Sequence, residues 1–170
     1  MTISITLRPF ELCDVDDFMV WASDEKVAKY CRWDTFHSRD DAVEFLKEII
    51  RSKAWYRAIC LNGRPVGSIF VLRQGTGKDG RRAELGYALS TEHWGKGVAT
   101  EAVKAVISNV FEEVKGLDRV EGLVFAENHA SQRVLEKAGF QREGVLSKYF
   151  YVKGQSRDIV VYCVVNNYAN

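Results

Sequence analysis

Hydrophobic and polar residues alternate along several stretches of the chain, and this alternation predicts β-strands. In Ile3–Leu7 the apolar residues Ile3, Ile5 and Leu7 are separated by polar ones, a pattern typical of an edge strand. Similar patterns, bounded by turn residues, predict six more strands at Trp55–Leu61, Val66–Arg73, Arg82–Ser90, Arg119–Phe125, Gly144–Val152 and Ile159–Val165.

A longer apolar repeat, close to 3.6 residues, predicts helices in four other segments. We expect Asp14 to cap a short first helix and Ser38 to cap a second. The clearest helix is Val98–Lys115, with a buried stripe of Ala99, Ala102, Val103, Val106, Val110 and Val114. The last is Asn128–Ala138, ended by Gly139.

The predicted elements follow the order β-α-α-β-β-β-α-β-α-β-β, which indicates a mixed α/β fold with a central sheet. The chain has 170 residues, a length that suits one hydrophobic core. We therefore expect a single domain over residues 1–170.

Composition narrows the classes of function. The formal net charge is +1, and this argues against nucleic-acid binding, which usually requires a basic surface. No apolar run of about 18 residues predicts a membrane span, and the first residues do not resemble a signal peptide. The four cysteines lack metal-binding spacing, so we expect reduced thiols, no metal and a cytoplasmic protein; the cysteines are Cys13, Cys31, Cys60 and Cys163.

One glycine-rich stretch has the spacing of a dinucleotide-binding motif. Gly75–Gly80 reads G-x-G-x-x-G, but the residues that follow it, Arg82–Tyr87, read as a strand. A dinucleotide site needs that turn to open a helix, whose N-terminus faces the pyrophosphate. We interpret this stretch as a hairpin loop.

A second glycine-rich stretch has the order that anion binding requires. A strand ends near Ser90, two glycines follow at Gly95 and Gly97, and the longest predicted helix begins directly after them. Glycines let backbone N–H groups approach a phosphate, and the helix N-terminus adds its positive dipole. Lys96 adds a cation. The alternative is a glycine-rich entry to a helix with no ligand.

In this and two further segments the chain resembles the GNAT superfamily of acyl-CoA N-acyltransferases, in particular the ribosomal-protein serine/alanine N-acetyltransferase type. Glu84–Tyr87 is similar to the family's fourth strand, and Trp94–Ala99 to its Q/R-x-x-G-x-G/A signature, with Trp94 in place of the usual Gln or Arg. Asn128–Phe140 is similar to the family's helix that ends in Gly-Phe. The resemblance covers nearly the whole chain.

The resemblance implies a mostly antiparallel sheet, splayed between the fourth and fifth strands, with the pantetheine arm of acetyl-CoA in the gap. A bulge at Ala88–Ser90 would offer an N–H to the thioester oxygen. Asn128 would bind the arm, or serve only as a helix cap. The implied cofactor-binding residues are Ala88, Leu89, Ser90, Trp94, Gly95, Lys96, Gly97, Val98, Ala99, Thr100, Asn128 and Ser131.

The implied reaction is direct attack of an amine on the thioester, with both substrates bound. Leu135 occupies the position of the superfamily's proton-donating tyrosine, so the resemblance points to Ser131 as the donor to the leaving thiolate. Glu84 is the candidate base, directly or through water. The structural alternatives are an ordinary first-turn serine and a strand carboxylate paired with Arg82 or Arg119.

For the acceptor, the family forms one wall of its site where the aromatic loop Tyr30–His37 lies. Trp33 and Phe36 in this loop, with Tyr149 on a late strand, are the candidate substrate-binding residues; the alternative for the loop is a lid over the core. The expected partner is an amine, either a protein N-terminus or a small amine, and the near-neutral chain indicates no strongly charged groove for a long peptide. We expect a monomer or weak homodimer. The alternative function is an acyl-CoA sensor without turnover.

Overall fold

The computed structural model describes residues 3–52 and 54–167. The chain divides into two compact units, each assembled from separate segments. Unit 1 comprises Met1–Phe70 and Tyr87–Ala102, and unit 2 comprises Val71–Gly86 and Val103–Asn170. The third and fourth strands and the fourth helix each contribute residues to both units.

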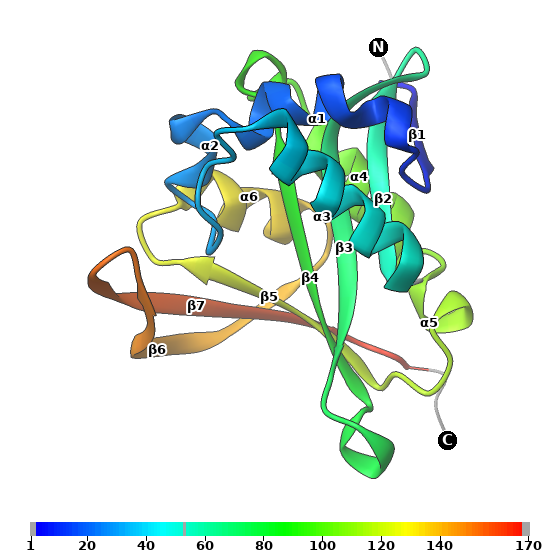
Figure 1. The fold of residues 1–170 in the computed structure, drawn as a ribbon. Helices are drawn as coiled ribbons and strands as arrows, with labels where there is room; N and C mark the ends of the chain where they lie inside the picture. The colour runs from blue at the N-terminus through cyan, green and yellow to red at the C-terminus, as the bar shows by residue number, and fades with distance from the viewer. Residues whose placement is uncertain (1–2, 53, 168–170) are drawn as a thin grey trace. The chain divides into compact units, whose positions relative to one another are not determined.

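Within residues 3–52 and 54–167, seven strands and six helices form the fold (Figure 1). The strands are β1 (Ile5–Arg8), β2 (Trp55–Leu61), β3 (Arg64–Gln74), β4 (Arg82–Leu89), β5 (Arg119–Phe125), β6 (Gln141–Val152) and β7 (Gln155–Val165). The helices are α1 (Val15–Ala22), α2 (Glu25–Ala28), α3 (Arg39–Ser52), α4 (Val98–Ile107), α5 (Val110–Glu113) and α6 (His129–Lys137). Short 3-10 turns lie at Leu12–Asp14, Gly77–Asp79 and Thr91–His93.

The mixed α/β prediction is confirmed. The strands are hydrogen-bonded in the order β1-β2-β3-β4-β5-β7-β6. Strands β1 and β2, β5 and β7, and β6 and β7 pair antiparallel, whereas β4 and β5 are parallel. The parallel ladder comprises three pairs, from Arg82–Arg119 to Glu84–Glu121, while β4 continues to Leu89 and β5 to Phe125.

Unit 1 is built around α1 and α3, which pack against each other beside β1 and β2. Its core is aromatic at the centre: Phe18 contacts Trp21, Phe36 and Phe45 with ring centroids 5.4 to 5.6 Å apart. Ser38 caps α3 as expected, because its Oγ accepts the N–H of Asp41 over 3.0 Å.

Asp14 is the N-cap residue of α1, as expected, but its side chain makes no capping hydrogen bond to that helix. The Asp14 carboxylate instead accepts two hydrogen bonds from Arg8, both 2.7 Å, and one from the N–H of Glu11. Burial of Asp14 would raise its pKa, but these hydrogen bonds outweigh the burial and hold the pKa of the carboxyl below its usual range. Asp14 therefore joins β1 to the start of α1.

The predicted helix Val98–Lys115 is interrupted, and a short helix was missed. Ser108 ends α4 with its Oγ donating to the carbonyl of Ala105 over 2.8 Å, and a new helix starts at Val110. Side-chain hydroxyls that bond nearby carbonyls compete with helix continuation. The missed helix, α2, spans four residues and begins where Asp24 accepts the N–H of Lys26.

In unit 2, β6 and β7 form a long hairpin whose outer strand, β6, is exposed along most of its length (Figure 1). Helix α6 packs against β5 and β6. The stretch Gly75–Gly80 joins β3 to β4, and Arg73 donates to the carbonyls of Gly80 and Lys115 at its base. Because a strand follows this loop, it lacks the helix that a dinucleotide site requires.

Candidate functional site

The two glycines ahead of α4 take a backbone conformation that other residues rarely adopt. Gly95 has φ 70° and Gly97 has φ 82°. A Cβ at Gly95 would have no neighbour within 4 Å, and one at Gly97 would lie 3.5 Å from Ile3 Cδ1. Side-chain crowding therefore does not explain these glycines, whereas the left-handed turn does.

Helix α4 begins directly after this turn, and its first backbone N–H groups can donate to a ligand. The hydrogen-bond ladder of α4 begins where the N–H of Glu101 donates to the carbonyl of Gly97 over 3.0 Å. The N–H groups of Val98, Ala99 and Thr100 precede this ladder and have no acceptor within the helix. The side chains of Val98 and Thr100 are buried, and Lys96 is exposed. The turn thus offers the backbone donors and the nearby cation that suit an anionic group such as a phosphate.

Trp94 anchors the glycine turn to β4. Its indole N–H donates to the carbonyl oxygen of Leu89 over 2.8 Å, while 43% of the residue stays exposed. The indole donor is therefore used within unit 1. Trp94 holds the loop in place, and its exposed ring is the part that remains to contact a ligand.

The end of β4 lies close to β3 in unit 1. Ala88, Leu89 and Ser90 are all buried, and the N–H of Ser90 donates to the carbonyl of Val66 over 2.9 Å. A Cβ on Gly67 would lie 2.4 Å from the Ala88 oxygen. Gly67 thus helps to position the end of β4, a role that the sequence analysis did not predict. A lone glycine inside a strand is the usual signal of such a close approach.

In unit 2, Asn128 caps the first turn of α6. Its Oδ1 accepts the N–H of Ser131 over 3.1 Å, so the helix-cap interpretation is confirmed. The cap uses the oxygen of the side-chain amide and leaves its N–H groups to donate elsewhere. Ser131 is half-buried one turn into the helix, and Leu135, one turn further, is 1% exposed.

Glu84 is buried on β4 in unit 2, with 7% of its surface exposed. Glu121 on β5 forms ion pairs with both arginines that the sequence offers as partners of Glu84: Arg119 at 2.9 Å and Arg82 at 3.9 Å. Glu121 is also the cross-strand partner of Glu84 in the parallel ladder. The structure therefore brings two carboxylates to neighbouring positions of β4 and β5.

The candidate acceptor residues lie in both units. Trp33 and Phe36 belong to unit 1, where Phe36 contacts Phe18 and Phe45 and Trp33 contacts Phe36 at 6.1 Å. Both are partly buried against the core, which agrees with a lid over it. Tyr149 belongs to unit 2, is 53% exposed and packs edge-on against Phe150.

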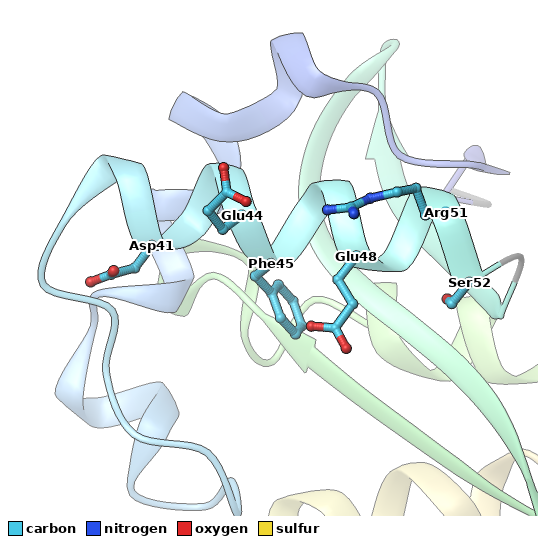
Figure 2. Close-up of a pocket in the computed structure, with 6 residues that line it drawn as sticks. All are labelled: Asp41, Glu44, Phe45, Glu48, Arg51 and Ser52. Atoms are coloured by element: carbon cyan, nitrogen blue, oxygen red, sulfur yellow. The ribbon is translucent and has the colours of Figure 1, made fainter.

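A groove of about 720 Å³ follows one side of α3 in unit 1 (Figure 2). Its lining has three carboxylates, one guanidinium, a ring and a hydroxyl: Asp41, Glu44, Glu48, Arg51, Phe45 and Ser52. Figure 2 shows that all six lining residues come from α3. The sequence predicts no strongly charged groove for a long peptide, and this groove has only a small excess of carboxylates because Lys47 pairs with Glu44 at 2.7 Å. The spacing of these acids along one helix face could have predicted this one, although the near-zero net charge concealed it.

Two buried cysteines are expected to be poorly reactive thiols. Burial, and then the hydrogen bond to Glu143, raise the pKa of Cys163 to about 11, and burial raises the pKa of Cys60. Across residues 3–52 and 54–167, no three histidine, cysteine or acidic side chains gather as a metal site would need. In the same part of the chain, none of the helices has the length and apolar character of a membrane span.

Comparison with known proteins identifies relatives across the chain. A family model described as an acetyltransferase (GNAT) domain matches residues 4–141. The uncharacterised N-acetyltransferase p20 of Bacillus licheniformis is 31% identical over 175 residues, which cover 96% of this chain and 94% of p20. The uncharacterised N-acetyltransferase YoaA of Bacillus subtilis is 47% identical over 85 residues, spanning only about half of either protein (50% and 48%). The crystal structure of a GNAT-family acetyltransferase from Bacillus anthracis is similar with a TM-score of 0.84 and 28% identity, over 97% of this chain and 98% of that one.

Two further relatives have names that specify an acceptor. The putative ribosomal N-acetyltransferase YdaF of Bacillus subtilis is 38% identical over 85 residues, 50% of this chain and 46% of YdaF. Spermidine N(1)-acetyltransferase of Escherichia coli K12 is 36% identical over 84 residues, 49% of this chain and 45% of that enzyme. The acceptors in these names differ, so the comparisons agree on acetyl transfer and diverge on the amine. Together with the glycine turn ahead of α4, they show that the chain belongs to the GNAT family of acetyltransferases, enzymes that take the acetyl group from acetyl-CoA.

Proposed function

We propose that this protein is a single-domain N-acetyltransferase that moves an acetyl group from acetyl-CoA to a primary amine by direct attack. The observation that carries the proposal is the left-handed turn at Gly95 and Gly97, which presents the N–H groups of Val98, Ala99 and Thr100 ahead of the α4 ladder. These donors, with Lys96, are the groups we assign to the pyrophosphate of the cofactor. Asn128 would donate its amide N–H groups to the pantetheine arm.

When bound, acetyl-CoA supplies an activated thioester carbonyl and a thiolate leaving group. At the end of β4, the N–H of Ser90 is used by Val66, so we assign the donor toward the thioester oxygen to Ala88 or Leu89. A fixed donor at this point stabilises the negative charge that develops during attack. Ser131 donates a proton to the departing thiolate and regains one from water, and Glu84 accepts the proton of the amine, directly or through water, and returns it to solvent.

For the acceptor we propose a cationic primary amine. The supporting observation is the α3 groove, whose lining carries Asp41, Glu44 and Glu48 against Arg51. Lys47 forms an ion pair with Glu44 at 2.7 Å, so three carboxylates meet two cations there. Such a surface attracts ammonium groups before deprotonation and reaction. A protein N-terminal α-amine and a polyamine both meet this description, and the names of YdaF and the spermidine enzyme represent the two. Trp33, Phe36 and Tyr149 remain the proposed apolar contacts.

The cofactor half is tested by calorimetry with CoA on Gly97→Glu. We expect binding to be lost, because a carboxylate would occupy and repel the pyrophosphate position. Gly97→Ala is the matched control. Its Cβ would make only an ordinary van der Waals contact, so this variant has the strain of a left-handed backbone, about 1–2 kcal/mol, but no added charge. Both variants are checked by circular dichroism. If the Gly97→Glu protein is folded and binds CoA normally, the pyrophosphate assignment is wrong.

The acceptor half is tested by thiol release from acetyl-CoA with two panels, peptides beginning with Ser, Ala or Met, and polyamines. We expect turnover with at least one panel, and a rise in KM for the active amine when Glu44 and Glu48 are changed to Gln. Asp118→Asn, a surface carboxylate of unit 2, is the control. Absence of turnover with both panels, while CoA binds, would favour a sensor without turnover.

A further inference from the structure

Helix α6 bears both Asn128 and Ser131 in its first turn, yet little apolar surface holds it to the sheet. It spans nine residues, and Leu135 is its one buried side chain. Most helices are stabilised by a broad apolar face packed on the core. The position of this helix therefore depends on a few specific contacts within unit 2.

The first contact is a close fit between Leu135 and Gly122 on β5. A Cβ on Gly122 would lie 2.5 Å from Leu135 Cδ1 and 3.3 Å from Cδ2. Real Cβ atoms do not approach other atoms so closely, so the absence of a side chain at Gly122 makes the space that Leu135 fills. Leu135 thus anchors the helix at the position where the superfamily has its tyrosine.

The second contact comes from the cross-strand partner of that glycine. Tyr162 on β7 pairs with Gly122 in the antiparallel ladder, and directly opposed residues point to the same face of a sheet. Tyr162 is fully buried, and its hydroxyl donates to Glu136 Oε1 over 2.9 Å. Burial, and then the bond to Glu136, raise the pKa of Tyr162, so its hydroxyl stays a donor at neutral pH.

The third contact joins the helix to the loop that precedes it. The side-chain N–H of Gln132 donates to the carbonyl of Ala126 over 2.9 Å, and its oxygen lies 3.4 Å from the Tyr162 hydroxyl. Ala126 is two residues before Asn128, and Gln132 directly follows Ser131. The neighbours of both functional residues are therefore fixed by one side chain.

We propose that Gly122, Leu135, Gln132 and Tyr162 form a positioning device that fixes the rotation and depth of α6, so that Ser131 and Asn128 meet the cofactor in the productive geometry. This inference rests on the proposed roles of those two residues. We assign none of the four to a reacting group. Their effect on the reaction passes through the placement of Ser131 and Asn128, for which an error of about 1 Å can cost about a hundredfold in rate.

A double-mutant cycle between Tyr162→Phe and Ser131→Ala tests the device. Tyr162→Phe keeps the ring and removes the hydroxyl. We expect kcat to fall about tenfold in the native chain and not to fall further in the Ser131→Ala background, because the residue being positioned is gone. A merely structural tyrosine would lower the melting temperature and reduce kcat by the same factor in both backgrounds, and that result would overturn the proposal. Tyr151→Phe, whose residue is 77% exposed on β6, is the matched control.

A size swap gives an independent readout. Gly122→Ala should lower kcat, because the new methyl group displaces Leu135 and the helix with it. Pairing it with Leu135→Val, which shortens the opposing side chain, should restore part of the loss. If Gly122→Ala leaves kcat unchanged, or the pair is no better than Gly122→Ala alone, the fit between β5 and α6 does not position the site.

An incorrect role for Ser131 and an incorrect positioning device would give different results. If Ser131→Ala keeps full kcat, the proposed role of Ser131 is wrong, and the device is then judged on CoA affinity. In that case Tyr162→Phe must weaken CoA binding in the native chain but not in the Asn128→Ala background. Equal CoA affinity of Tyr162→Phe and the native chain would then overturn the device.

Discussion

The indole N–H of Trp94 donates to the carbonyl oxygen of Leu89 over 2.8 Å and so ties the glycine turn before α4 to the last residue of β4. Two parts of the proposed cofactor site in unit 1 are joined by this bond: the end of β4, which we assign to the thioester, and the turn, which we assign to the pyrophosphate. A Gln or Arg, usual at this position in the superfamily, has a more flexible side chain. The tryptophan is a stiffer connection.

Trp94→Phe should therefore weaken CoA binding. An aromatic ring is kept, although a smaller one, and one hydrogen bond is lost, which typically contributes about 1 kcal/mol and corresponds to about a fivefold change in affinity. Calorimetry with CoA measures the change. Trp55→Phe on β2 is the control and should bind as the native chain does; a Trp94→Phe protein with native affinity would show that the bond does not support the site.

Ser131→Ala should lower kcat and kcat/KM for acetyl-CoA together, by about a hundredfold, if its hydroxyl acts only as the thiolate forms. The measurement is the rate of thiol release at saturating acceptor, with the exposed Ser156→Ala on β7 as control. A rise in KM with kcat little changed would instead assign Ser131 to ground-state contact with the pantetheine arm.

Glu84→Gln tests the proposed base. We expect the acidic limb of the pH–rate profile to flatten or shift, because the group that must be ionised for the reaction has been removed. Melting temperature is measured in parallel, since Glu84 is buried. A lower melting temperature with an unaltered profile would make Glu84 structural and leave proton removal to water.

Asp14→Asn should lower the free energy of unfolding at neutral pH by about 1–3 kcal/mol, since it removes the carboxylate that accepts from Arg8 and Glu11. Arg8 is one-third exposed, which keeps the estimate well below that for a fully buried ion pair. The pKa of Asp14 is depressed in the folded state, so its contribution is complete above the unfolded value of about 3.9 and is lost as pH falls through the folded value.

Urea unfolding of both proteins at pH 7 and across the range below pH 4 checks this sign. The difference between the native chain and Asp14→Asn should shrink as the solution becomes more acidic. A difference that stays constant down to the lowest pH would mean that the Asp14 charge does not contribute to stability.

The sequence predicted the order of the seven strands and the principal helices because each has a clear apolar period. The predictions failed where a side chain competed for the backbone. Ser108 interrupts the long helix, and Asp14 binds Arg8 in place of its own helix terminus. Neither outcome is encoded in local periodicity, since each depends on which hydrogen-bond partner a polar side chain finds.

Within the candidate site, local sequence was informative for the turn and not for its supports. Two glycines before a long helix indicated Gly95 and Gly97 directly. The supporting contacts join residues far apart in the chain, as Gly67 does with Ala88 and Gly122 with Leu135. A single sequence records that a glycine is present but not which atom occupies the space it leaves.

The short parallel ladder has a consequence for the order in which the chain folds. At its outer end Arg81 pairs with Asp118 at 2.5 Å, across 37 positions of sequence, and the ladder runs from there to Glu84 and Glu121. Closing such a long loop costs conformational entropy, and the three residue pairs of the ladder offset this cost only once they have all formed. We therefore expect β4 and β5 to pair after the local elements have formed. Gly95 and Gly97 lie inside that loop. The turn can form with α4 as soon as the helix does, while the strand pairing of β4 with β5 waits for one of the slowest steps of folding.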